Sequence, residues 1–378
     1  MKALAPARRW AIERALPLWS GPGYDVRLGL FHERLDMERR PIAASPRRVM
    51  VEARQIAIFA RAALTGWHKA GAEADSLERV IRLYHRRDGA PGWIFSVHPD
   101  GSPASMSRDL YAHAFILYAL AWQYRLTGAG ALIALADETL AEIDLIFAAP
   151  HGGYRDAVPP QDDIRRQNPH MHLLEALLAL FEVTGAERYM ARAGDLVALA
   201  RCRFITADGG ALIEEFGPCW QPLASPGANR VEPGHLFEWA WLFGEYTRLG
   251  GIIDSLAGEK LVAFATRNGL DAATGRIVDA VNETGAVVAA STRAWPHAEG
   301  VKALAAAGRQ RDDAAATSDL LLGYLMRTFA PDSLAGGWID RFDAQGAPLV
   351  DHMPASTLYH IAGAIFEADV RFGSARSA

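Results

Sequence analysis

The sequence predicts an all-α protein, a ring of six helix pairs with short β-hairpin loops at one end, and two repeating glycine patterns support this prediction. In the first pattern, a glycine follows each segment of helical apolar periodicity, as a glycine at a helix end does. Its members are Gly66, Gly128, Gly185, Gly250, Gly308 and Gly373. In the second pattern, a glycine opens a short stretch of alternating residues. Its members are Gly29, Gly92, Gly153, Gly210, Gly275 and Gly337. Neighbours within each pattern are 57 to 65 residues apart, so both patterns have the same period.

The shared period indicates one structural unit repeated along the whole chain. Repeated helix pairs with hairpins at one end imply a closed ring, an (α/α)6 barrel that forms a single domain over residues 1–378. An open solenoid of the same helix pairs is the structural alternative. In a closed ring the connecting loops gather at one mouth, where residues far apart in the sequence converge.

Apolar periodicity marks the helices in order. Residues 49–64 carry apolar side chains at i, i+3 and i+4 spacing, and residues 110–121 repeat that pattern. Asn168 followed by Pro169 predicts the N-cap and the first residue of the next helix of this kind. Between helix pairs the period shortens towards two, as in residues 337–343, which predicts the strands of the hairpins.

The composition limits the classes of function. Half of the 378 residues are hydrophobic and the mean hydropathy is +0.01, which suits one large core. A net charge of −5 argues against nucleic acid or an anionic membrane as the main partner. Cys202 and Cys219 are too few for a disulfide scaffold, and no leader or membrane-span pattern is evident, so a cytoplasmic location is expected. The oligomeric state stays open, a homodimer included.

Three histidine positions suggest a site at the mouth. His172 (with His170 beside it), His235 and His360 each lie in the first two turns of a predicted inner helix. A single such histidine is more often a hydrogen-bonded core residue. Equivalent placement in three different units favours a shared cavity over three separate core histidines.

Charged and polar neighbours extend this candidate site. Glu238 follows His235 by one helical turn, so its carboxylate can set the tautomer of His235 or bind a substrate hydroxyl. Glu299, which opens another inner helix, either faces the cavity or pairs with an arginine. Arg54 lies among apolar residues, where a guanidinium needs a polar cavity or a buried acid.

Three further residues are weaker candidates. Tyr111 opens an inner helix and is a candidate for the cavity wall, whereas the neighbouring Asp109 is equally well explained as an N-terminal helix charge. Arg230 precedes the segment of His235 and either caps a developing oxyanion or binds its own loop.

The patterns of common cofactor and nucleophile sites are missing. His170 and His172 are two residues apart on a helix, so their side chains point apart and do not readily share a metal ion. No glycine-rich phosphate loop and no Gly-x-Ser-x-Gly motif is evident, and neither cysteine neighbours a histidine. We therefore expect no metal, no nucleotide cofactor and no nucleophilic triad.

Six segments resemble the N-acylglucosamine 2-epimerase superfamily, which includes mannose isomerases, sulfoquinovose isomerases and cellobiose 2-epimerases. They are residues 54–56 (RQI), 109–115 (DLYAHAF), 168–176 (NPHMHLLEA), 233–239 (PGHLFEW), 295–300 (WPHAEG) and 354–360 (PASTLYH). The likeness runs in order from about Trp19 to the last helix, and the mannose-isomerase branch looks closer than the N-acylglucosamine epimerases themselves. It implies an (α/α)6 barrel and a metal-independent mechanism.

The resemblance also implies roles for particular residues. His235 and His360 match the acid/base pair of the superfamily, and His172 matches its third cavity histidine. The residues that match the lining of its sugar pocket are Arg54, Tyr111, Asn168, Arg230, Glu238 and Glu299.

The implied reaction is the interconversion of a neutral aldose and its 2-ketose, of the D-mannose and D-fructose type. Proton transfer through a cis-enediol needs a base, an acid and donors for the enediolate, for which His235, His360 and Arg54 are expected, with Glu238 orienting His235. The same groups suit a 2-epimerase, of the mannose/glucose or N-acylglucosamine type.

Other classes of function stay open. Paired carboxylates would suit an inverting glycosidase, and a non-catalytic sugar-binding protein is a third class. Phosphorylated or sulfonated sugars rank behind neutral ones because no cluster of basic residues marks a cavity loop.

Overall fold

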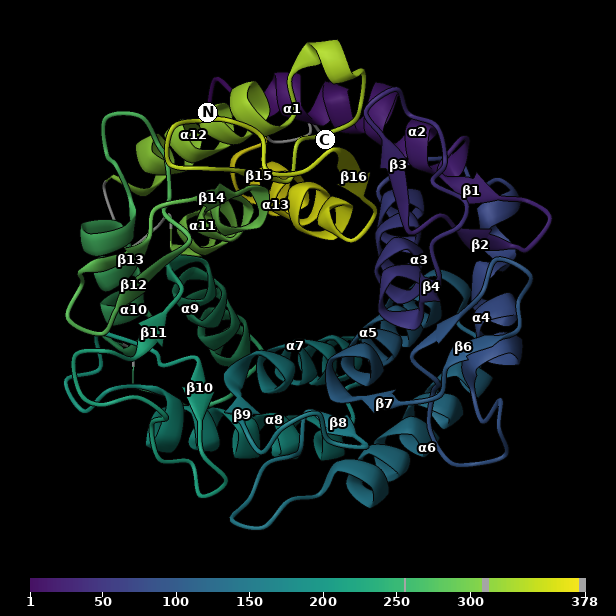
Figure 1. The fold of residues 1–378 in the computed structure, drawn as a ribbon, viewed down its shortest axis with the longest axis horizontal. Coiled ribbons are helices and arrows are strands. Elements are labelled where there is room, and N and C mark those ends of the chain that lie inside the picture. The colour runs from purple at the N-terminus through teal and green to yellow at the C-terminus, as the bar shows by residue number, and fades with distance from the viewer. Residues whose placement is uncertain (255, 308–312, 374–378) are drawn as a thin grey trace.

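The computed structural model describes residues 1–254, 256–307 and 313–373, whose helices form two concentric rings (Figure 1). The inner helices are α3 (Val49–Leu64), α5 (Leu110–Thr127), α7 (Gln167–Thr184), α9 (Pro233–Arg248), α11 (Ala294–Ala307) and α13 (Thr357–Phe372). The outer helices are α1 (Leu4–Trp10), α2 (Leu16–Ser20), α4 (Ser76–Tyr84), α6 (Gly130–Phe147), α8 (Glu187–Leu199), α10 (Leu256–Gly269) and α12 (Ala314–Tyr324). Short π-helical or 3₁₀ turns span Ala11–Ala15, Ala72–Asp75, Ala200–Phe204, Leu325–Phe329 and Asp332–Leu334.

The ring is closed, because the last inner helix lies beside the first. Helix α13 packs against both α11 and α3, and α1 packs against α12 and α13 (Figure 1). The predicted (α/α)6 barrel is confirmed, and an open solenoid is wrong because its terminal units would not meet. The buried apolar side chains form one cluster from Leu4 to Ala368. No helix within the described ranges is long and apolar enough to cross a membrane.

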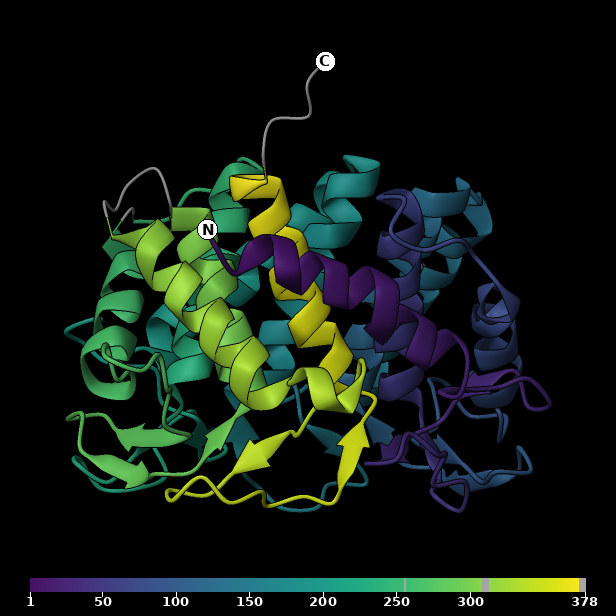
Figure 2. The same cartoon turned by 90° about the horizontal axis from the view of Figure 1, so that it is seen from above.

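Short antiparallel strands lie along one end of the barrel (Figure 2). The pairs and triplets are β1 (Tyr24–Asp25) with β2 (Leu30–Phe31), β3 (Arg34–Asp36) with β16 (His352–Pro354), β4 (Arg47–Arg48) with β5 (Ser96–Val97) and β6 (Pro103–Ser105), β7 (Arg108–Asp109) with β8 (Ala157–Val158), β9 (Arg165–Arg166) with β10 (Glu215–Phe216), β11 (Arg230–Val231) with β12 (Ala280–Asn282) and β13 (Val287–Ala289), and β14 (Thr292–Arg293) with β15 (Arg341–Phe342).

Most of these strands join consecutive units. The two residues before an inner helix pair with the loop that precedes the next inner helix, as Arg165 pairs with Phe216. Strand β16 pairs with β3 and closes the circle. Loop residues of one unit therefore lie against the beginning of the preceding inner helix, an arrangement that the expected hairpins within each unit did not include.

The glycine pattern holds with small shifts. Left-handed φ angles occur at Gly66, Gly128, Gly185 and Gly250, which follow inner helices, and at Gly29, Gly92, Gly153 and Gly275, which precede the loops. In the fourth and sixth loops, the residues with positive φ are the preceding glycines, Gly209 and Gly336. Gly373 ends α13 with an ordinary φ of −58°, and Gly308 lies outside the described residues.

Three histidines fasten the loops to the inner helices. In each, Nδ1 lies against the carbonyl oxygen four residues earlier, and Nε2 accepts a backbone N–H from the loop after an outer helix. They are His113, His170 and His297, which accept from Trp93, Tyr154 and Ile277 at 2.9 to 3.0 Å. Burial lowers their pKa values to about 4, 4 and 3, so they are neutral structural groups.

The start of α7 differs from the prediction. The helix begins at Gln167, and Arg166 is its N-cap residue. Asn168 lies within the first turn and is not the N-cap, because β9 carries the chain directly into the helix.

Candidate active site

The three predicted cavity histidines come together at the mouth, where the inner helices begin. His172, His235 and His360 are 3%, 7% and 7% exposed. The ring of Trp295 lies between two of them, with its centroid 4.7 Å from that of His235 and 5.7 Å from that of His360. Tyr359 lies between His172 and His360, at 6.3 and 4.8 Å. His170, by contrast, points away into the loop, as its spacing from His172 predicts.

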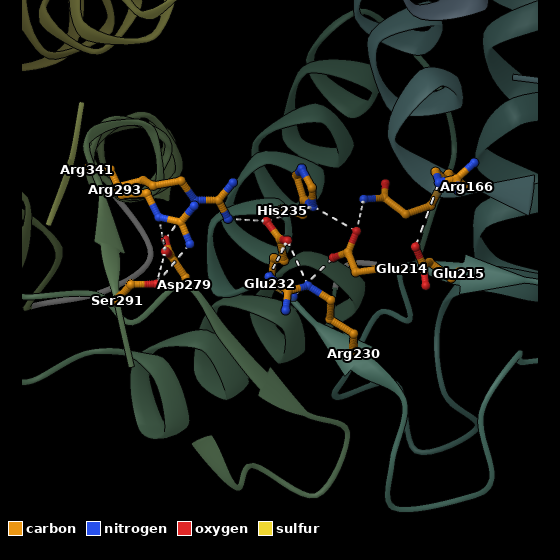
Figure 3. Close-up of polar contacts among 11 residues, drawn as sticks. Arg166, Glu214, Glu215, Arg230, Glu232, His235, Asp279, Ser291, Arg293 and Arg341 are labelled. Carbon is orange, nitrogen blue, oxygen red and sulfur yellow. Dashed lines mark hydrogen bonds and ion pairs between the residues drawn. The ribbon is translucent and has the colours of Figure 1, made fainter. Parts of the chain in front are cut away.

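A carboxylate from the neighbouring loop holds His235. Glu214 Oε2 lies 2.9 Å from His235 Nδ1 (Figure 3). The Gln167 side-chain amide and the backbone N–H of Glu232 donate to Glu214 at 2.8 and 3.1 Å, while Gln167 accepts from the Trp239 indole. Burial, the largest single effect, lowers the pKa of His235. The negative charge and hydrogen bond of Glu214, together with the charge of Glu232, outweigh burial, and the pKa lies above its ordinary 6.5.

Ion pairs at the rim surround this contact (Figure 3). Arg293 donates to Glu232 at 2.7 Å and to Asp279 at 2.8 Å. Arg341 lies 3.5 Å from Asp279. Arg230 bonds Glu232 at 2.9 Å with its side chain 41% exposed. The geometry thus places Arg230 on the surface, where it binds its own loop, one of the two alternatives that its position in the sequence left open.

His360 is held by a carboxylate that also forms an ion pair with a lysine. Glu299 Oε1 lies 2.7 Å from His360 Nδ1, and Glu299 Oε2 lies 2.8 Å from Lys302 Nζ. Lys302 also packs over the Trp241 ring at 3.9 Å. Burial, together with the positive charges of Arg54 and Lys302, holds the pKa of His360 well below its ordinary value. Glu299 therefore pairs with a lysine and a histidine, not with an arginine.

The third histidine rests on a third carboxylate. His172 Nδ1 lies 3.2 Å from Glu175 Oε2, and the Tyr359 hydroxyl donates to the same carboxylate. Burial lowers the pKa of His172 to about 4. Burial would raise the pKa of Glu175, but the hydrogen bond from His172 and the charge of Lys302 lower it to about 2. A neutral His172 thus donates to an ionised Glu175.

Glu238 lies among these groups without a hydrogen-bond partner. It is 1% exposed, and both carboxyl oxygens lack a partner among the described residues. The Nδ1 atom of the neutral His172 lies 3.8 Å from its Oε1. Burial and the neighbouring charge of Glu299 raise its pKa well above the ordinary value, so Glu238 is a neutral acid with a proton to donate.

The expectation that Glu238 orients His235 is wrong, because Glu214 makes that contact. Nδ1 of His235 faces back towards the loop at the start of the helix. The step of three residues from His235 carries Glu238 deeper, towards His172.

Arg54 packs against aromatic rings and not against a buried acid, which was one of the two environments expected for it. Its guanidinium lies 4.1 Å from the Phe115 ring centroid and 4.8 Å from that of Tyr359. It donates to the Tyr111 hydroxyl and to the Ser356 carbonyl. No carboxylate lies within ion-pair distance of it in the described parts of the chain, which leaves its charge available to a bound ligand.

Tyr111 and Asn168 line a cavity of about 550 Å³ beside the loops. Burial raises the pKa of Tyr111 to about 12, so its hydroxyl stays protonated. The side-chain oxygen of Asn168 is buried without a partner among the described residues. Asp109 caps α5 by accepting the N–H of Ala112 at 2.8 Å, which confirms the helix-charge alternative.

Within this site, two overlapping groups have the donor atoms of a metal site. They are His172, Glu175 and Glu238, and Glu238, Glu299 and His360, with donor atoms within 4.8 Å of one another. The ammonium group of Lys302 already supplies positive charge to these carboxylates. A divalent cation there would face that charge, so the donor set suits an ion poorly.

Sequence reasoning missed Glu214, Glu175, Lys302 and Tyr359. Glu175 and Lys302 each follow a predicted residue by three positions, a spacing that puts both side chains on one helix face. Tyr359 precedes His360 directly. Glu214 had no local signal, because only the pairing of β9 with β10 brings its loop to α7 and α9.

The fold and the buried histidine–carboxylate pairs are those of an (α/α)6-barrel enzyme. The sequence profile of the N-acylglucosamine 2-epimerase family matches residues 29–364, and the chain belongs to that family. It is therefore an enzyme of a sugar isomerase and epimerase family.

Individual relatives agree with this assignment. The chain is 32% identical over 372 residues to a mannose-6-phosphate isomerase of Rhizobium meliloti, covering 95% of both chains. It is 28% identical to a D-mannose isomerase of Thermobifida fusca, over 55% of this chain and 54% of that one. The solved cellobiose 2-epimerase of Bacillus thermoamylovorans superposes with a TM-score of 0.85 at 19% identity, covering 97% and 99% of the two chains, which shows the shared fold.

Proposed function

We propose that the protein interconverts an unphosphorylated aldose and its 2-ketose, of the D-mannose and D-fructose type, by histidine acid/base catalysis without a cofactor. The observation that carries this proposal is the pair formed by His235 and His360. Both are buried at one mouth, each has Nδ1 against a carboxylate, and their pKa values are displaced in opposite directions. A matched acid and base is what enediol chemistry requires.

The opposite shifts of their pKa values give the two histidines different roles in the proposed reaction. His360 is neutral and serves as the base that removes the proton from C2 of the open-chain aldose. His235 is protonated and donates to the carbonyl oxygen O1 as the cis-enediol forms. His235 then takes the proton of the O2 hydroxyl, while His360 returns its proton to C1, which yields the ketose with protons balanced.

Other residues stabilise the charge that develops on O1 and O2. Arg54, with no carboxylate partner, and the protonated Glu238 are suited to donate hydrogen bonds to these oxygens. Tyr111, whose ring centroid lies 4.7 Å from that of His172, and Asn168, whose buried side-chain oxygen has no partner among the described residues, are suited to bind the sugar hydroxyls. His172 is neutral and tied to Glu175, which suits a hydrogen-bonding role near the substrate.

A neutral sugar is favoured by the charge balance of the rim. Arg166, Arg230, Arg293 and Arg341 each lie within 4 Å of a carboxylate, so a phosphate group would compete with pairs already made. Mannose 6-phosphate is the second candidate, because the R. meliloti relative carries that activity in its name.

Two alternatives use the same residues. Return of the proton to the other face of C2 would give a 2-epimerase, which the family description supports. An inverting glycosidase built on Glu238 and Glu299 has less support, because Glu299 is engaged on both oxygens by His360 and Lys302.

The test is a screen in heavy water, read by NMR, with D-mannose, D-glucose, N-acetylglucosamine, cellobiose and mannose 6-phosphate as separate substrates. The proposal predicts conversion of D-mannose to D-fructose with deuterium in the product. Faster turnover of mannose 6-phosphate than of mannose would replace it by the second candidate. Glucose as the sole product from mannose would make the enzyme an epimerase, and release of glucose from cellobiose would make it a glycosidase.

A further inference from the structure

Lys302 lies in the interior of the barrel among carboxylates from different helices. It is 3% exposed on α11, with Nζ 2.8 Å from Glu299 Oε2. The negative charge of Glu175 on α7 also acts on it. Its ammonium group lies 3.9 Å from the Trp241 ring centroid. Such a buried cation is stable only because acids and an aromatic face surround it.

Lys302 reaches His360 through Glu299. One oxygen of Glu299 meets Lys302 and the other meets His360 Nδ1, at 2.8 and 2.7 Å. A carboxylate held at both oxygens cannot turn away from the imidazole. When it is ionised it accepts the Nδ1 proton, which leaves Nε2 bare to receive another proton.

The corresponding contact of His235 has no such cation. Glu214 is held by the amide of Gln167 and the backbone N–H of Glu232. Among the described residues, no lysine or arginine forms an ion pair with Glu214. The full negative charge of Glu214 therefore acts on His235, whereas Lys302 offsets the charge that Glu299 presents to His360.

We propose that Lys302 is a positioning residue of the isomerase reaction, whose ammonium group keeps Glu299 ionised against His360 Nδ1 so that His360 presents a bare Nε2 to the substrate. The inference rests on the proposed function, which makes His360 the base. Lys302 acts through Glu299 and needs no contact with the sugar.

Each inner helix contributes a charged or titratable group to the cluster around Lys302 and His360. These groups are Glu299 on the helix of Lys302, His172 and Glu175 on α7, His235 and Glu238 on α9, Tyr359 and His360 on α13, Arg54 on α3 and Tyr118 on α5. Burial raises the pKa of Glu299, and Lys302 acts against that rise.

Removal of Lys302 can change the protonation of either Glu299 or His360, and both changes have the same consequence for catalysis. If Glu299 takes up a proton, its O–H donates to Nδ1 and shifts the His360 proton to Nε2. If Glu299 stays ionised, its uncompensated charge raises the pKa of His360, which then stays protonated. Both changes deprive His360 of its bare Nε2 near neutral pH, and both reverse as the pH rises.

The test is the pH dependence of kcat and KM for the aldose of highest activity in the Lys302→Met variant. We expect kcat to fall near pH 6 to 7 and its acid limb to move up by about 1 to 3 pH units, the size of shift that a neighbouring opposite charge produces. KM should change less than kcat. Lys302→Arg, which keeps the charge, should return the limb towards its wild-type position, and Lys260→Met, at an exposed lysine of α10, should change neither quantity.

Two results would overturn the inference. One is an unchanged acid limb with a uniform loss of kcat, which a structural role alone would produce. The other is a Lys302→Met variant with wild-type kcat and limb. If Lys302→Met does not fold, Lys302→Gln removes the same charge and retains hydrogen-bonding groups.

Nitrogen-15 NMR of histidine-labelled protein provides a readout without turnover. His360, identified by the loss of its signals in His360→Asn, should carry its proton on Nδ1 with Nε2 bare from pH 6 to 8. A proton on Nε2 in the wild type would contradict the inference. If the wild type converts no aldose, the proposed function fails by itself, while the NMR result still tests the geometry at His360.

Discussion

Glu214 Oε2 and His235 Nδ1 lie 2.9 Å apart, although Glu214 belongs to the loop before one inner helix and His235 to the first turn of that helix, 21 residues later. The contact forms because β10, which directly follows Glu214, pairs with β9 of the preceding unit. The carboxylate both sets the tautomer of His235 and raises its pKa.

Glu214→Gln should reduce kcat by at least about 10- to 100-fold, the effect of losing the carboxylate behind a metal-bound histidine. His235 acts in its protonated form, and Glu214 raises its pKa. The variant should therefore lose activity at a lower pH, so the alkaline limb of kcat moves down. Glu215→Gln, on the neighbouring and partly exposed carboxylate, is the matched control. An alkaline limb that does not move in Glu214→Gln would refute the assignment of His235 as the acid.

Glu238→Gln should retain much more activity than Glu238→Ala, because an amide still donates a hydrogen bond as the protonated acid does. It should also raise the free energy of unfolding at alkaline pH. The native pKa of Glu238 lies above its ordinary 4.5, so native Glu238 keeps a proton that the unfolded chain releases above that pH, and stability falls as the pH rises. Urea unfolding at pH 5 and pH 8 measures the difference. A variant that is less stable than the wild type at pH 8 would show that Glu238 is ionised and paired.

His170→Ala and His172→Ala should separate structure from chemistry. Loss of His170 leaves the part-buried N–H of Tyr154 without its acceptor, at a cost of about 1 kcal/mol or more in the free energy of unfolding. Activity per folded molecule should remain. His172→Ala should instead lower kcat/KM. Equal loss of kcat/KM in both variants, measured below the unfolding transition, would contradict the distinction.

Arg54→Lys and Arg230→Ala should differ strongly. Arg54 stacks on Phe115 and Tyr359, and lysine cannot reproduce the planar stacking. We expect a large fall in kcat for Arg54→Lys. Arg230 is an exposed ion-pair partner of Glu232, so its loss should cost no more than about 1 kcal/mol in stability, with activity close to the wild type. Strong loss of activity in Arg230→Ala alone would return Arg230 to the sugar pocket.

Chelators should leave the activity unchanged, since Lys302 supplies the cation among the buried carboxylates. Extended dialysis against EDTA, followed by assay with and without added Mg²⁺, Mn²⁺, Zn²⁺ or Co²⁺, is the measurement. Lost activity that an added ion restores would assign a metal to the cluster around Glu238.

Periodic features of the sequence predicted most of the architecture. Glycines at a common spacing indicated the repeat, and histidines early in the inner helices indicated the mouth. The difference between His170 and His172 followed from helical phase alone. Such local patterns are reliable because helix geometry fixes the direction of each side chain.

Most of the failures come from contacts between units. Glu238 was expected at His235 because the two share a helix face, yet the Nδ1 atom faces a loop that strand pairing brings in. Asn168 was read as an N-cap, but the preceding strand continues into the helix one residue earlier. Arg230 was expected in the pocket by alignment of a motif, but an ion pair to Glu232, two residues away, holds its side chain at the surface. Long-range strand pairing, which one sequence does not reveal, decided the first two cases.

The most direct test of the central claim is the conversion of D-mannose in heavy water by the wild type and by His360→Asn, with deuterium at C1 of the fructose measured by NMR and folding checked by circular dichroism. The account predicts fructose that carries deuterium at C1 from the wild type, and neither conversion nor C2 exchange from the folded variant. Fructose formed by the wild type without solvent deuterium under any condition, or full exchange by His360→Asn, would contradict it.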